Sequence, residues 1–172
     1  MVSTDIEYSE GEDDMTAAVL PNTDTDIDAD LHRAARQLRL DFGWSPVVRG
    51  GLLQVELDED LSAIELDRDH AVDVLTRLRA RGLDCPVVTV PGGERNRCVL
   101  FFRQDTAEPF PSSVTVLPAG RTVVVPPSVT LPGRVHWLGS PWTERVDLPS
   151  ARVLAATVAR RADQAAAGLL SA

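Results

Sequence analysis

The stretch LSAIELDRDHAVDVLTRLRARG, residues 61–82, decides the fold class of this chain. It predicts a short strand at 62–66, an acidic turn at 67–69 and a helix that Gly82 ends. Two carboxylates, Glu65 and Asp67, fall where the strand ends and the helix begins, a position at which many α/β folds bind ligands. Apolar residues recur along the helix at the spacing of one buried face: Ala71, Val74, Leu75 and Leu78.

Hydrophobic patterning predicts further elements on either side of this unit. Helices are expected from Asp26 or Asp28 to Leu40, and from Ser150 to about Gly168. Extended segments are expected at 45–48, 52–57, 86–90, 98–103, 114–117, 122–125 and 134–138. Most connections after residue 86 are too short for crossovers between parallel strands. The sequence therefore predicts an α/β (α+β) single domain, with a mixed, mostly antiparallel sheet flanked by helices.

Two hairpins are predicted among these strands. Residues 55–60 and 64–69 echo each other at an offset of nine residues, which suits two strands joined by a tight turn. The second hairpin would join 114–117 to 122–125 around Pro118. The first hairpin would bring Asp58 to the edge that carries Glu65 and Asp67. Asp58 is therefore the acid most expected to join them, ahead of Glu56 and Asp147.

The charge is divided unevenly along the chain. The net charge is −9, yet residues 1–30 hold ten acids and no arginine, so residues 31–172 carry a net charge of +1. We expect a disordered acidic tail at 1–25, a folded domain at 26–168 and a short end at 169–172. The tail is either a solubilising leader or an acidic arm. Such an arm would cover an arginine patch, or engage a protein partner as a mimic of nucleic acid.

Composition limits the cellular setting. No apolar run approaches the roughly 18 residues of a membrane span, and the acidic N-terminus is unlike a signal peptide. We therefore expect no membrane partner and a cytoplasmic location. The two cysteines, Cys85 and Cys98, have no metal-ligand spacing and do not indicate an oxidising compartment.

The order of landmarks over roughly residues 31–160 resembles the bifunctional DNA primase/polymerase (Prim-Pol) domain of the archaeo-eukaryotic primase superfamily. The resemblance implies a primase-type, RRM-like core. The landmarks are Gly43-Trp44, the acid-x-acid pair Glu65-Leu66-Asp67, Pro91-Gly92-Gly93, Phe101-Phe102, the strand ending in Pro126-Pro127-Ser128, Gly133 to Trp137, and Leu148-Pro149.

Members of that family use three acids to hold two divalent metals, Mg²⁺ or Mn²⁺, for phosphoryl transfer. The resemblance assigns two of these acids to Glu65 and Asp67. It places a phosphate-contacting histidine near Arg97 or Cys98, and the third acid close to Thr115. Neither candidate position is a histidine, and residues 112–125 contain no Asp or Glu. The family's metal site is therefore incomplete in this sequence.

The sequence favours a degenerate primase/polymerase-like domain that is catalytically inactive and serves as a binding or regulatory module for nucleotide or nucleic acid. Arg95 and Arg97 are candidate phosphate ligands, although their sequence context favours a solvated hairpin tip. Two alternatives remain. One is an active nucleotidyltransferase with Glu65 and Asp67 as ligands of Mg²⁺ or Mn²⁺. The other is a protein-interaction adaptor that works through the acidic tail.

Overall fold

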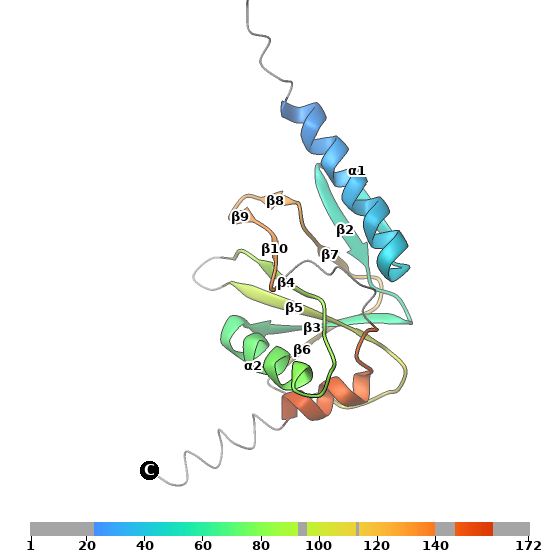
Figure 1. Cartoon of the computed structure of the whole chain (residues 1–172), viewed down its shortest axis with the longest axis vertical. Helices are drawn as coiled ribbons and strands as arrows, with labels where there is room; N and C mark the ends of the chain where they lie inside the picture. Colours follow the sequence, from blue (N-terminus) through green and yellow to red (C-terminus); the bar gives the residue numbers. More distant parts are fainter. Residues whose placement is uncertain (1–22, 93–95, 113, 140–146, 160–172) are drawn as a thin grey trace, which may run out of the picture.

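The computed structural model describes residues 23–92, 96–112, 114–139 and 147–159 (Figure 1). The last of these ranges contains a helix over 151–159, called here the C-terminal helix. The other elements are α1 (Thr23–Phe42), β1 (Pro46–Arg49), β2 (Leu52–Glu56), β3 (Leu61–Asp67), α2 (Arg68–Arg79), β4 (Val87–Val90), β5 (Arg97–Arg103), β6 (Thr115–Leu117), β7 (Thr122–Val124), β8 (Val129–Thr130), β9 (Gly133–Arg134) and β10 (His136–Trp137).

The strands divide between two main sheets. The large sheet has five strands in the order β10-β4-β5-β3-β6, and the small sheet has three in the order β1-β2-β7. Strands β8 and β9 form a separate two-stranded ladder. Every pairing between these strands is antiparallel. The predicted α+β class, with a mostly antiparallel sheet flanked by helices, is confirmed.

The large sheet is covered on both faces. Strand β3 shows this directly, because Ile64 and Leu66 are buried with α2 and the C-terminal helix, whereas Leu61 and Ala63 are buried with α1 and the small sheet. Figure 1 shows α2 and the C-terminal helix together on one side of the large sheet, and α1 against the small sheet. Burial on both faces also explains the continuous apolar run of β5.

The first predicted hairpin is wrong. β2 pairs with β1 and β7, whereas β3 pairs with β5 and β6, so the chain leaves one sheet for the other between them. The carboxylate of Asp58 makes this possible. Its Oδ1 accepts hydrogen bonds from the backbone N–H groups of Asp60 (2.9 Å) and Leu61 (2.7 Å), which closes a tight turn.

The second predicted hairpin is also wrong, because β6 joins the large sheet and β7 joins the small one. The two connections between sheets lie side by side. Gly120 N–H donates to the Leu57 carbonyl, and Leu57 N–H donates to the Arg121 carbonyl, both at 2.8 Å. These bonds fix the β2–β3 connection against the β6–β7 connection, at the place where a pocket opens between the two sheets.

The segment Pro126-Pro127-Ser128 ends β7 in a defined way. Proline cannot donate to a sheet ladder, so the partner strand must find another group. The buried hydroxyl of Ser128 supplies it, accepting from Leu53 N–H at 2.8 Å and donating to the Leu53 carbonyl at 3.3 Å. The Leu53 carbonyl also accepts Val125 N–H at 2.9 Å, so the Ser128 hydroxyl extends the β2–β7 ladder by one side-chain contact.

Several predicted boundaries shift. No turn separates β3 from α2, because the strand runs to Asp67 and the helix starts at Arg68. α1 begins at Thr23, and the strand predicted at 134–138 is divided between β9 and β10. Within the described ranges, no helix is long and apolar enough to cross a membrane. Most of the predicted acidic tail, up to residue 22, and residues 160–168 of the predicted C-terminal helix lie outside the described residues.

Candidate functional site

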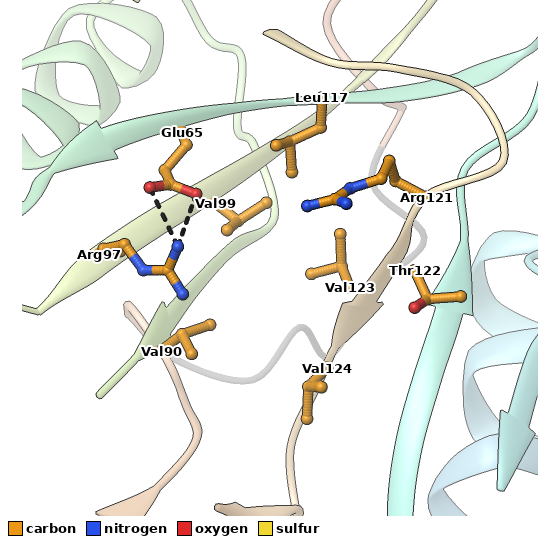
Figure 2. Close-up of a pocket in the computed structure, with 9 residues that line it drawn as sticks. All are labelled: Glu65, Val90, Arg97, Val99, Leu117, Arg121, Thr122, Val123 and Val124. Atoms are coloured by element: carbon orange, nitrogen blue, oxygen red, sulfur yellow. Dashed lines mark hydrogen bonds and ion pairs between the residues drawn. The ribbon is translucent and has the colours of Figure 1, made fainter. Parts of the chain in front are cut away.

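A pocket of about 150 Å³ opens where the large and small sheets meet (Figure 2). We call it the Glu65 pocket. Polar and apolar groups share its wall, and the charges on it come from one carboxylate and two guanidinium groups. Its lining residues are Glu65, Val90, Arg97, Val99, Leu117, Arg121, Thr122, Val123 and Val124.

Glu65 is the acidic residue in this wall. It lies opposite Val99 in the antiparallel register of β3 and β5, which makes Arg97 its diagonal neighbour on the same face. Nη1 of Arg97 lies 3.4 Å from Oε1 and 3.3 Å from Oε2 of Glu65. The Glu65 side chain is 25% exposed and that of Arg97 is 57% exposed. The carboxylate is thus already engaged by a cation of the protein.

Asp67, the second acid of the predicted metal pair, has a different task. Its Oδ1 accepts the backbone N–H of His70 at 2.8 Å, so it is the N-cap of α2. Its side chain is exposed and does not line the Glu65 pocket. The two acids share one side of β3 by alternation, but only one of them faces the pocket.

The position expected for a third acid is directly opposite Glu65. Thr115 is the Cα partner of Glu65 in the β3–β6 register, and it can offer only a hydroxyl. Asp58, the acid expected to move in from the first hairpin, is bound instead in its own turn. Across the described part of the chain, no group of three or more His, Cys, Asp or Glu side chains could hold a metal ion. These residues do not fit a two-metal centre.

The strand register also separates the two candidate positions for the phosphate-contacting histidine. Arg97 faces the pocket, whereas Cys98 points to the opposite core and is fully buried. Burial raises the pKa of the Cys98 thiol above its ordinary value, so it stays protonated and cannot bind an anion. Arg97 is therefore the residue placed to contact a phosphate. Arg95, the other predicted ligand, lies outside the described residues.

Arg121 is a pocket residue that the sequence reasoning missed. It precedes β7, and its backbone is fixed by hydrogen bonds from its N–H to the Pro118 carbonyl and to its carbonyl from Leu57 N–H. Figure 2 shows its guanidinium extending over the pocket from the side opposite Glu65 and Arg97. The mistaken hairpin hid this residue, because it placed Arg121 beside a turn instead of between two sheets.

Together, the fold and this pocket define an α+β domain in which a charged cleft opens between two antiparallel sheets. The model of the family described as bifunctional DNA primase/polymerase, N-terminal, matches residues 27–151, well over half of the chain. The chain belongs to this family of primase/polymerase-like nucleotidyltransferases. Searches of the curated proteins and of the solved structures each found no match.

Proposed function

We propose that this chain is a catalytically inactive primase/polymerase-family domain that serves as a binding or regulatory module for nucleotide or nucleic acid. One observation carries the proposal: the carboxylate of Glu65 is paired with Arg97 and faces Thr115, where the family pattern calls for a third acid. Membership of the family supports an interaction with nucleotide or nucleic acid.

The charges in the pocket argue against a divalent ion. Mg²⁺ needs near-octahedral oxygen ligands, and Glu65 is the sole carboxylate among the described lining residues. Two unit charges about 4 Å apart interact by roughly 4 kcal/mol near a protein surface, and a divalent ion doubles this figure. An arginine 3.3 Å from the Glu65 oxygens therefore opposes a metal at the same carboxylate.

Primer synthesis on a single-stranded template tests the proposal. The full-length chain should make and extend no primer with Mg²⁺ or Mn²⁺, beside a known polymerase as positive control. A product that disappears in Asp67→Asn would overturn the proposal. Asn is as good an N-cap as Asp, so this substitution removes the charge while keeping the cap of α2. Asp67→Ala removes both charge and cap, and the pair separates a loss of metal binding from a loss of structure.

The active nucleotidyltransferase remains the competing enzyme hypothesis, with Glu65 and Asp67 as metal ligands. It requires nucleotide binding that depends on Mg²⁺ or Mn²⁺. Calorimetry of a nucleoside triphosphate with and without metal distinguishes the two hypotheses, because an inactive module without a metal site shows no such dependence.

The uneven charge distribution favours a second role, that of an adaptor. Residues 1–30 hold ten acids and no arginine, a composition suited to competing with nucleic acid for a basic surface. Deletion of residues 1–22, which lie before α1, should then abolish the capture of protein partners in pull-downs, and unchanged pull-downs would count against the adaptor. If the arm instead covers an arginine patch, the same deletion should reveal DNA binding that weakens steeply with salt, and equal DNA affinity before and after the deletion would count against that arm.

A further inference from the structure

We infer that the Glu65 pocket binds a phosphate group without a metal ion, held by the guanidinium groups of Arg97 and Arg121, with Glu65 as an internal competitor for Arg97. The inference rests on the proposed function and deepens it. The site, which does not fit a two-metal centre, would use guanidinium groups as its cations in place of metal ions.

The two arginines reach the pocket from different sheets. Arg97 stands at the start of β5 in the large sheet, and Arg121 stands just before β7 in the small sheet. Figure 2 shows the two guanidinium groups on opposite sides of the pocket, with Glu65 beside Arg97. A phosphate group between them would accept hydrogen bonds from both sides. Guanidinium suits this task because its planar fork matches phosphate oxygens.

Both arginines have hydrogen-bond donors that no described residue engages. Only Nη1 of Arg97 bonds to Glu65, so Nε and Nη2 have no hydrogen-bond partner among the described residues. The Arg121 side chain has neither an ion pair nor a hydrogen bond within the described part of the chain. The formal charge of the three ionised lining groups is one net positive, which favours an anion.

The Arg97–Glu65 contact is open to competition. Its distances of 3.3 and 3.4 Å are longer than the roughly 2.7–2.9 Å of a strong charge-assisted hydrogen bond. Exposed ion pairs of this kind contribute little to stability. A phosphate group can therefore take Arg97 from Glu65, and the Glu65 carboxylate then repels the bound anion. Removal of that negative charge must strengthen anion binding, the reverse of its effect on a metal site.

The size of the pocket limits the ligand to its phosphate portion. Pockets for whole small molecules usually measure roughly 300–1,000 Å³. A pocket of about 150 Å³ admits a phosphate group or diphosphate but not a sugar and base as well. Recognition is therefore independent of the base. The phosphate comes either from a free nucleotide or from a single-stranded nucleic acid backbone.

Calorimetry of the full-length chain with inorganic pyrophosphate in EDTA is the test. We expect saturable binding that is no weaker in EDTA than with Mg²⁺. Arg97→Gln and Arg121→Gln should each weaken it by about tenfold or more, the usual effect of losing a hydrogen bond from a charged group. Glu65→Gln should tighten it by about two- to fivefold, the range of an exposed charge pair.

Arg103→Gln is the matched control. Arg103 is exposed and lies on the same side of β5 as Arg97, at the other end of the strand, about 20 Å away. Its substitution should leave binding unchanged, and circular dichroism should show that every variant is folded. Absence of binding in EDTA, weaker binding by Glu65→Gln, or an equal loss in Arg103→Gln would overturn the inference.

Two further titrations in EDTA identify the source of the phosphate. One uses a nucleoside triphosphate, and the other uses a single-stranded oligonucleotide without a terminal phosphate. The one that binds with the same dependence on Arg97 is the source. Pyrophosphate binding without either of them would overturn the assignment to nucleotide or nucleic acid. Primer synthesis remains the separate test of the proposed function, since a silent primer assay with no anion binding removes only this inference.

Discussion

The two faces of strand β3 differ in how freely their residues can change. On one face, Ile64 and Leu66 are buried beneath α2 and the C-terminal helix. On the other face, the apolar residues Leu61 and Ala63 give way to Glu65 and Asp67 at the end of the strand. Core packing constrains the residues of the first face, whereas the two acids of the second face do not belong to a hydrophobic core. Chemistry at this strand end can therefore change while the fold remains.

The largest effect is expected on the packed face. Ile64→Ala should lower the free energy of unfolding by about 2–5 kcal/mol, because Ile64 is fully buried and the smaller side chain leaves a cavity. Urea denaturation measures this change, and Ile64→Val should cost only about 0.5–1.5 kcal/mol. Pyrophosphate affinity of the folded fraction should be unchanged. A loss of affinity with intact stability would break the separation between the two faces.

A second effect on the packed face depends on pH. Burial raises the pKa of the Cys85 thiol far above its ordinary value, and also raises the pKa of Cys98. A thiol whose pKa is higher in the folded chain than in the unfolded chain makes its full contribution to stability below the unfolded pKa, near 9.0. That contribution is lost as the pH rises beyond this value. The free energy of unfolding should therefore fall above pH 9, by up to about 1.4 kcal/mol per pH unit for each thiol.

Denaturation series between pH 7 and about 10.5 check this slope. The chain contains no lysine, so lysine titration does not complicate the alkaline range. Cys85→Ala should make the free energy of unfolding fall less steeply with pH, because it removes the contribution of that thiol. This holds even if the substitution lowers stability at every pH. A stability that stays level through the series would show that the packed face admits water.

Much of this packed face could be predicted from the sequence. The helical spacing of Ala71, Val74, Leu75 and Leu78 correctly indicated the buried stripe of α2, and the extended segment predicted at 98–103 is part of β5. Periodicity reports burial because both depend on the same local geometry. Periodicity does not show which strands pair with each other, and for this reason both predicted hairpins were wrong. The pairing partner of a strand depends on turns such as the one that the Asp58 carboxylate closes.

The third effect lies at the junction of the two faces. Asp67→Ala should lower stability by about 1 kcal/mol, because it removes the N-cap of α2. Asp67→Asn should be nearly neutral, since Asn caps equally well. Thermal denaturation of the three proteins distinguishes a cap from an inert carboxylate. Equal stability of Asp67→Ala and the original chain would show that the acid has no structural task.

The candidate site was only partly readable from the sequence. Glu65 and Arg97 were singled out, but their ion pair depends on the register of β3 and β5, which lie far apart in the chain. Arg121 reaches the pocket from another sheet, so its role required the correct strand order. The absence of an acid near Thr115 could be seen in the sequence. That Thr115 stands directly opposite Glu65 could not.

The smallest effect on stability is expected from Glu65→Gln, and it separates the two acids most sharply. The Arg97–Glu65 pair is long and partly exposed, so its loss should change the free energy of unfolding by less than about 0.5 kcal/mol. A double-mutant cycle with Arg97→Gln, read by urea denaturation, should give a coupling energy of about 0.2–0.5 kcal/mol. A coupling well above this range would mean that the pair braces the two strands, which would hold Arg97 away from an incoming anion. A coupling within it leaves Arg97 able to exchange Glu65 for phosphate, so that Asp67 governs stability while Glu65 governs the pocket.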